Sequence, residues 1–232
     1  MVQLNCCLPT QAWLISKERE YLYSLLALLF RSPPTPKTLE IMLSPGIITK
    51  ISSILKRVPY AKAEHAGQIL EMILYTCKEI SRKREYQFQQ EFASLFLAHN
   101  GISPFETDYL YSQPYYKKVA REMLKLTYEI AGPLKRRDFY PLDHISVELD
   151  FAAVLIRQEA RKTYKPQGLM IYQQLFLKDH LVRWVPLFCR EIETRLQPEM
   201  FYHQIAQVTG SLINLDQGIL NIRAETNPVM TG

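Results

Sequence analysis

The chain has 232 residues, 47% of them apolar, which is enough to bury a sizeable hydrophobic core. Its 28 basic and 23 acidic residues give a net charge of +5 that is spread along the chain, so no basic tract marks a nucleic-acid partner. No apolar run approaches the length of a membrane span, and the first residues lack a basic stretch followed by an apolar one. We therefore expect a cytoplasmic protein without stable membrane insertion.

Only 8 residues are glycine, and alternating runs of β-branched and polar residues are nearly absent. The composition predicts an all-α fold, a single-domain helical bundle of roughly ten helices that occupies residues 1–232. The cysteines, Cys6, Cys7, Cys77 and Cys189, show neither metal-binding spacing nor the density of a disulfide scaffold. We expect reduced thiols and assign no role to the adjacent pair Cys6 and Cys7.

The first half of the chain begins with a segment, 1–15, that we expect to be poorly structured. Ser16 then predicts the N-cap of an apolar helix that ends near residue 31, because a serine hydroxyl accepts a bond from a free helix amide. Thr35 followed by Pro36 predicts the start of a short second helix. Further helices are expected over about 46–57 and 60–98, the longer one divided near Ser81.

The second half contains the most regular amphipathic pattern, over 115–131. There, one face carries Val119, Met123, Leu126 and Ile130, and the opposite face carries Lys118, Glu122, Lys125 and Glu129. A last helical region, 167–215, should break near Pro186 and Pro198, because an interior proline removes a backbone hydrogen bond. The tail, about 217–232, is expected to be irregular.

The stretch "YPLDHISVELDF", residues 140–151, places ionisable groups on an apolar helix. On a helical projection His144 and Glu148 fall among apolar residues, one turn apart. Asp143 is suited to cap the helix that follows, and His144 with Glu148 is suited to form a partly buried pair. On composition alone, Phe96, Phe105 and Tyr109 belong in a core.

Two separated segments together resemble a known family: "YQFQQEFASLFLAHNGISPFETDYL" and "GPLKRRDFYPLDHISVELDF". In the first, a helix ending in Leu-Phe leads to a loop with proline, an aromatic residue and glutamate; the second has a Pro-x-Asp-His run followed by an apolar helix. The resemblance is to the TorD/DmsD/NarJ chaperones. It rests on Leu95, Phe96, Pro104, Phe105, Glu106, Pro141, Leu142, Asp143, His144, Glu148 and Leu149.

This resemblance implies a cytoplasmic chaperone, not an enzyme, that needs no cofactor or metal of its own. Such a chaperone binds the twin-arginine leader and the precursor of a molybdenum-containing oxidoreductase, assists cofactor insertion and prevents premature export. A homodimer is compatible with the sequence. The implied leader-binding residues are Leu95, Phe96, Pro104, Phe105, Glu106, Pro141, Asp143, His144 and Glu148.

The chemistry agrees with this interpretation, because a leader with two guanidinium groups and an apolar helix needs a hydrophobic groove beside carboxylates. Between residues 138 and 159 the chain has five carboxylates, Asp138, Asp143, Glu148, Asp150 and Glu159, against a single basic residue, Arg157. Glu91, Glu106 and Asp108 flank the first loop. The chain is therefore locally acidic although its net charge is positive.

Parts of the sequence are compatible with two other functions. A metal-dependent enzyme could use His144 and Glu148 with Asp143 or Glu91, but no complete ligand set or phosphate-binding loop is visible. A helical DNA-binding regulator would need a recognition helix with Lys, Arg, Asn or Gln on one face, and none stands out. The sequence favours the chaperone.

Overall fold

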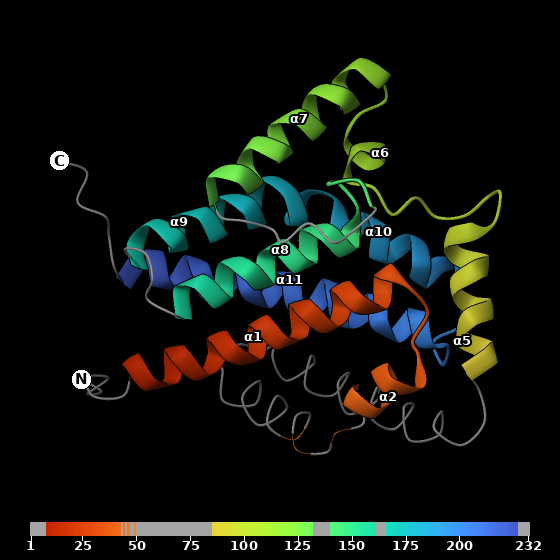
Figure 1. The fold of residues 1–232 in the computed structure, drawn as a ribbon, viewed down its shortest axis with the longest axis horizontal. Coiled ribbons are helices and arrows are strands. Elements are labelled where there is room, and N and C mark those ends of the chain that lie inside the picture. The colour runs from red at the N-terminus through yellow and green to blue at the C-terminus, as the bar shows by residue number, and fades with distance from the viewer. Residues whose placement is uncertain are drawn as a thin grey trace.

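The computed structural model describes residues 8–42, 44, 46, 49, 85–131, 140–160 and 166–226, and the regular elements within these ranges are helices (Figure 1). The predicted all-α bundle is confirmed. The helices are α1 (Leu8–Arg31), α2 (Pro36–Met42), α5 (Glu85–Phe92), α6 (Glu106–Leu110), α7 (Pro114–Ala131), α8 (Ile145–Ala160), α9 (Pro166–Phe176), α10 (Val182–Arg195) and α11 (Phe201–Thr226). Two π-helical turns, Ala93–Leu97 and Leu177–Leu181, continue α5 and α9.

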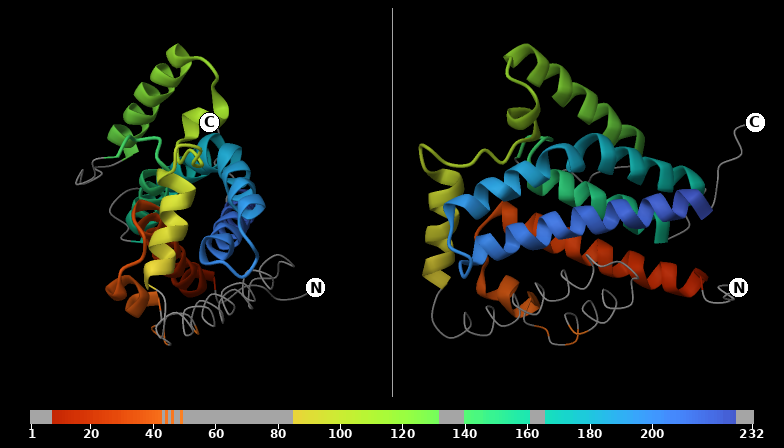
Figure 2. Two further views of the ribbon diagram at one scale, coloured as in Figure 1. Left: turned by 90° about the vertical axis from the view of Figure 1, so that its right-hand side faces the viewer. Right: turned by 180° about the vertical axis from the view of Figure 1, so that it is seen from behind.

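The core lies between α1, α8, α9, α10 and α11, which run lengthwise through the molecule (Figures 1 and 2). α1 packs along α8, and α10 packs along α11. An aromatic cluster at one end of the bundle joins α1, the end of α5, the first π-helical turn, α10 and α11. It consists of Phe30, Phe92, Phe96, Phe188 and Tyr202.

α1 begins at Leu8, so the expectations of a helix start at Ser16 and of a poorly structured segment up to residue 15 are wrong for residues 8–15. Ser16 is buried inside the helix. Pro9 does not interrupt α1, because it lies in the first turn, where backbone N–H groups have no partner within the helix. The start of α2 is as predicted: the N–H of Thr38 donates to the Thr35 hydroxyl, 3.2 Å away.

α11 continues to Thr226, well into the tail that we expected to be irregular. Its late turns are packed against the bundle, since Leu215, Asp216 and Leu220 are buried and the Gln174 amide donates to the carbonyl of Leu220. Tertiary packing here outweighs the weak helix propensity of the sequence. Pro228 follows shortly after the end of the helix.

The expected break near Pro186 is wrong, because α10 runs through this proline. The irregularity falls one turn earlier, in the π-helical turn Leu177–Leu181, and buried side chains on both sides of the proline, Trp184, Val185 and Phe188, hold the helix in place. The predicted break near Pro198 is confirmed between α10 and α11. The helices expected within residues 50–84 and the division near Ser81 lie outside the described residues.

α7 matches the predicted helix 115–131 but projects from the body, as Figure 2 shows from two further sides. The side that meets the body carries Leu124 and Tyr128, which are buried, and Arg121. Val119, Met123 and Leu126, which share one face of the predicted helix, are 42%, 60% and 49% exposed. The most regular amphipathic face of the chain is therefore turned to solvent.

Candidate functional site

The two motif loops meet in the structure. The N–H of Glu106 donates to the carbonyl of Asp143, and the N–H of Ile145 donates to the carbonyl of Pro104, each over 2.8 Å. These bonds form an isolated antiparallel bridge between Phe105 and His144, whose rings also touch. We call this contact between residues 103–108 and 140–145 the loop joint. It brings together the two segments that carry the family resemblance.

α8 starts directly at the loop joint, and His144 caps it. The N–H of Ser146 donates to Nδ1 of His144 over 3.1 Å, and the Ser146 hydroxyl lies 2.8 Å from the same nitrogen. The interpretation of Asp143 as the cap is therefore wrong, because its side chain points elsewhere. His144 is buried, and burial, aided by the charge of Arg31 and opposed by Asp143, lowers its pKa to about 4. The ring is neutral at pH 7.

Asp143 fastens α7 to the loop joint. Its Oδ2 accepts from Nε of Arg121 at 2.8 Å and from the Thr107 hydroxyl at 2.6 Å, and Nη2 of Arg121 also donates to that hydroxyl. Asp143 is fully buried, and its other oxygen, Oδ1, meets no donor within the described part of the chain. A buried acceptor without a partner is unusual and is a candidate for ligand contact.

Two buried carboxyl groups, Glu106 and Glu148, lie next to each other beneath the joint. Glu148 accepts from the indole N–H of Trp184 at 3.0 Å, while Glu106 lies 2.9 Å from Nδ1 of His180. Burial, together with the neighbouring charges of Glu106 and Asp143, raises the pKa of Glu148 well above its ordinary value. Glu148 therefore pairs with Trp184 and Glu106 rather than with His144, as the helical spacing had suggested.

The apolar residues of the motif are divided between core and surface. Leu95 is buried, and Phe96 packs in the aromatic cluster against Phe30 and Phe188, so neither lines an open groove. Pro104 and Phe105 are half-buried, and Pro141 is exposed beside Tyr140. The surface of the loop joint is thus small, apolar and aromatic.

Asp108 supplies the accessible carboxylate of the joint. Its side chain is 34% exposed and accepts from Nζ of Lys117 at 2.6 Å and from the Ser103 hydroxyl. Partial burial alone would raise the pKa of Asp108, but the hydrogen bonds from Lys117 and Ser103 and the charges of Lys117 and Arg121 outweigh it and lower the pKa. An ion pair this exposed contributes little to stability and is readily exchanged.

The acidic segment 138–159 does not form a free negative patch over its described residues. Asp143 pairs with Arg121, Asp150 lies 3.6 Å from Arg31, and Glu159 accepts from Gln173. Its one cation, Arg157, binds Glu20 on α1. Asp138 lies outside the described residues. Glu91, near the first loop, accepts from the N–H of Tyr202 and so caps the start of α11.

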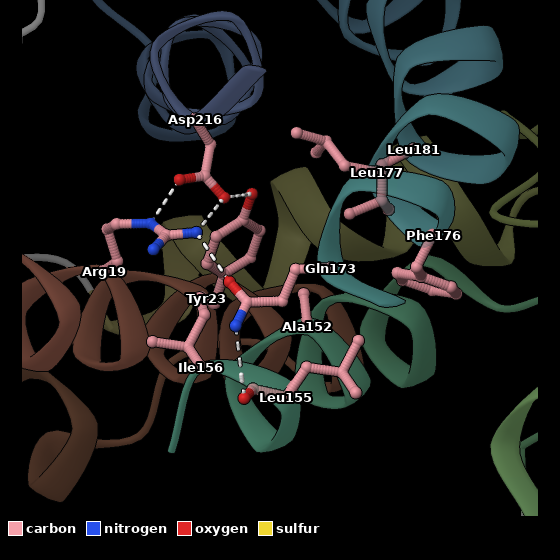
Figure 3. A pocket seen from close by; sticks show the side chains of 10 residues that line it. All are labelled: Arg19, Tyr23, Ala152, Leu155, Ile156, Gln173, Phe176, Leu177, Leu181 and Asp216. Atoms are coloured by element: carbon pink, nitrogen blue, oxygen red, sulfur yellow. Dashed lines mark hydrogen bonds and ion pairs between the residues drawn. The ribbon is translucent and has the colours of Figure 1, made fainter. Parts of the chain in front are cut away.

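A second polar cluster, which the sequence did not reveal, lies in the core between α1, α9 and α11. Figure 3 shows Arg19 forming a two-pronged ion pair with Asp216, whose Oδ2 also accepts from the Tyr23 hydroxyl at 3.0 Å. Gln173 links the Arg19 guanidinium to the carbonyl of Leu155. Burial alone would lower the pKa of Arg19, but the Asp216 carboxylate outweighs it and raises the pKa. The sequence offered little signal for this pair, because Arg19 lies among other charged residues of α1 and Asp216 is 197 positions away on α11.

Across the described ranges, no group of three or more His, Cys, Asp or Glu side chains is arranged to hold a metal ion. Outside the motif, His180 lies 2.9 Å from a carboxylate oxygen of Glu106, His203 lies 3.1 Å from the carbonyl oxygen of Leu196, and His99 is exposed. Cys189 is a free, buried thiol, and burial raises its pKa. Cys6, Cys7, Cys77 and His65 lie outside the described side chains.

Gly101 shapes the turn that leads into the loop joint. A Cβ at this position would lie 2.9 Å from the carbonyl oxygens of both Ala98 and Leu95, closer than Cβ atoms approach backbone. Gly101→Ala is therefore expected to lower the free energy of unfolding by about 1–3 kcal/mol. Gly210→Ala is the matched control: a Cβ there meets nothing within 4 Å inside α11, and we expect a gain of about 0.5–1 kcal/mol. Urea unfolding of both variants checks this, and equal effects would contradict it.

Fold and loop joint together define the class: an all-helical protein in which a Leu-Phe helix and loop are bridged to a Pro-x-Asp-His loop. Residues 57–190 match the family model described as nitrate reductase delta subunit. The chain belongs to this family, and the resemblance to the TorD/DmsD/NarJ group is confirmed.

Among curated relatives, the chain is 29% identical to the chaperone protein TorD of Photobacterium profundum over 116 residues, or 48% of this chain and 54% of that protein. It is 26% identical to the TorD chaperone of Aeromonas salmonicida, over 57% of this chain and 60% of that one. With the TorD chaperone of Aliivibrio salmonicida, 26% identity extends over 87% of this chain and 94% of the relative. The first two alignments span little more than half of those relatives. Among the helices within the described ranges, none is long and apolar enough to cross a membrane.

Proposed function

We propose that this protein is a cytoplasmic chaperone without enzymatic activity, which binds the twin-arginine leader and the precursor of a molybdenum-containing oxidoreductase. It assists insertion of the cofactor into that client and prevents premature export. The observation that carries the proposal is the loop joint, in a chain of this family. Its surface offers half-buried aromatic and proline side chains beside an accessible carboxylate, a combination that suits an apolar leader with guanidinium groups.

The residues implied by the resemblance divide into two groups in this proposal. Pro104, Phe105 and Pro141 contact the leader directly, since they reach the surface. The others form the support beneath the surface that fixes the shape of the joint: the buried Leu95, Glu106, His144 and Glu148, and the partly buried Phe96. Asp143 belongs to both groups, because Oδ2 holds Arg121 while Oδ1 has no donor within the described part of the chain.

Asp108 joins the site as the first carboxylate that an approaching arginine meets. Its partner Lys117 is a single ammonium group, whereas a guanidinium can bind a carboxylate through two parallel hydrogen bonds. A leader arginine therefore displaces Lys117 from Asp108. A second guanidinium that reaches Oδ1 of Asp143, after a small movement of the joint, would satisfy that buried acceptor.

Isothermal titration with a synthetic twin-arginine leader tests the function. Micromolar or tighter binding is expected, limited by the ordering of the peptide, and a leader with both arginines changed to alanine should bind at least about tenfold more weakly. Equal binding of the two peptides would remove the electrostatic part of the proposal. No binding of any leader, and no molybdenum oxidoreductase precursor among proteins that copurify from the native cell, would overturn it.

Charge variants then test the site. Asp108→Asn and Asp143→Asn should each weaken leader binding about tenfold, and Lys117→Ala should strengthen it several-fold by releasing Asp108. Glu199→Gln, at an exposed position between α10 and α11, is the control and should bind as the unmodified protein does. Asp143→Asn also loses its ion pair with Arg121 and will melt lower; affinity is therefore measured at a temperature where each variant is folded. Unchanged affinity of both aspartate variants would show that these carboxylates serve structure alone.

A further inference from the structure

The proposed function does not explain the outer face of α7. α7 is held to the body by one face only, through Arg121, Leu124 and Tyr128. The opposite face carries an apolar stripe made of Tyr115, Tyr116, Val119, Met123 and Leu126, each at least 42% exposed. Contiguous apolar stripes of this kind on a surface mark interaction sites. Figures 1 and 2 show that the helix stands clear of the other described elements along much of its length.

The charges beside this stripe indicate its partner. Along one flank run Lys118, Glu122, Lys125 and Glu129, all exposed and alternating in sign. Lys118 and Glu129 are equidistant from a point between residues 123 and 124, and so are Glu122 and Lys125. When this helix is laid against an antiparallel copy of itself about that point, Lys118 meets Glu129 and Glu122 meets Lys125, on both sides of the two-fold axis.

Geometry favours the antiparallel arrangement. Two antiparallel helices can be related by a two-fold axis that is perpendicular to both of them. This axis places the charged flank of each helix on the same side of the interface, so the two charged flanks meet each other. In a parallel pair the charged flank of one helix would meet the opposite flank of the other, where Ala120 and Thr127 lie. The antiparallel pair alone matches every charge with one of opposite sign while burying the apolar stripe.

We propose that the outer face of α7 is a self-association surface, on which a second copy of this chain packs its own α7 antiparallel, with Met123 near the two-fold axis. The equal numbers of lysine and glutamate on the flank give no attraction for a cationic leader, which argues against the leader as occupant. One helix pair is small for an interface, below about 1,200 Å² in total, so the dimer should be weak and depend on concentration. The proposal does not rest on the chaperone function.

Sedimentation velocity of the full chain, from low to high micromolar concentration, tests the proposal. A reversible monomer–dimer equilibrium is expected. Met123→Asp, which places two carboxylates at the axis, should raise the dissociation constant at least about a hundredfold. Leu187→Asp is the matched control, an exposed apolar residue on α10, and should leave the dissociation constant unchanged. Circular dichroism checks that both variants are folded.

Charge reversal tests the antiparallel register. Lys118→Glu should weaken the dimer about threefold to tenfold, because two carboxylates then face each other at each end, and adding Glu129→Lys should restore it. Met123→Cys should crosslink readily between copies under oxidation. Monomer at every concentration, or a dimer indifferent to Met123→Asp, would overturn the proposal. Failure of the double charge variant to recover would overturn the antiparallel register, and a leader peptide that crosslinks to position 123 would assign the face to the client instead.

Discussion

Replacing Asp216 by alanine is expected to lower the free energy of unfolding by about 3–5 kcal/mol, the largest effect of any single substitution considered. Asp216 is the carboxylate that neutralises Arg19, and both side chains are almost fully buried. Without it the guanidinium stays inside the core with Gln173 as its remaining hydrogen-bond partner among the described residues, and the Tyr23 hydroxyl loses its acceptor. Leaving a buried charge without its counter-ion lowers the free energy of unfolding by far more than the intact ion pair contributes to it.

Two further variants separate this effect from a general loss of packing. The double variant Arg19→Met with Asp216→Leu removes both charges and should regain most of the lost stability, since apolar replacements of a buried ion pair are often neutral or stabilising. Arg157→Gln breaks the half-exposed pair with Glu20 and should cost less than about 1 kcal/mol. Urea unfolding followed by circular dichroism measures all three. A loss below about 1 kcal/mol in Asp216→Ala would contradict the assignment.

His144 and Glu148 should change the free energy of unfolding with pH in opposite directions, and single substitutions should reveal each effect. Burial lowers the pKa of His144 to about 4, so between about pH 6.5 and 4 the unfolded state binds a proton that the folded state does not. That difference stabilises the fold above pH 6.5 and is lost as the pH falls, by about 3 kcal/mol in total. Glu148 has the opposite sign: its raised pKa favours the folded state below about pH 4.5, and this contribution is lost as the pH rises.

Between pH 4.5 and 6.5 the two groups should therefore partly cancel in the unmodified protein. Glu148→Gln keeps an acceptor for Trp184 and should leave a free energy of unfolding that rises with pH across this interval. His144→Asn keeps a side chain suited to capping and should leave a free energy of unfolding that falls with pH. Urea titrations at half-unit pH steps give both slopes. Parallel pH profiles for the two variants would show that these groups do not dominate the pH dependence.

The sequence predicted well what depends on neighbours along the chain. The helical class, the start of α2 at Thr35, the extent of α7 and the break near Pro198 follow from local propensity and capping. The family resemblance correctly selected two segments that the fold brings into contact at Phe105 and His144. The local pattern also predicted a negative patch between residues 138 and 159, which does not form over the described residues of that segment.

What the sequence could not show depends on which helices become neighbours. Asp143 pairs with Arg121 on α7, and Asp150 lies near Arg31 on α1. Nothing in the local sequence around either arginine indicates these pairings. The Arg19–Asp216 pair spans nearly the whole chain. The amphipathic pattern over 115–131 correctly predicted the helix α7, but it could not show that the apolar stripe stays exposed, because periodicity reveals an apolar stripe and not what covers it.

α7 is attached to the body of the protein at several points along one side. Tyr128, packed against Phe151 and Phe176, holds one end, while the joint grips the middle of the helix through Arg121 and Asp143. Near the start of the helix, beside Tyr115 and Tyr116, Lys117 is paired with Asp108, so these attachments span most of a helix that extends about 27 Å. The Pro-x-Asp-His loop, which binds Tyr128 through the carbonyl of Leu142 and Arg121 through Asp143, therefore determines where the outer face of α7 stands.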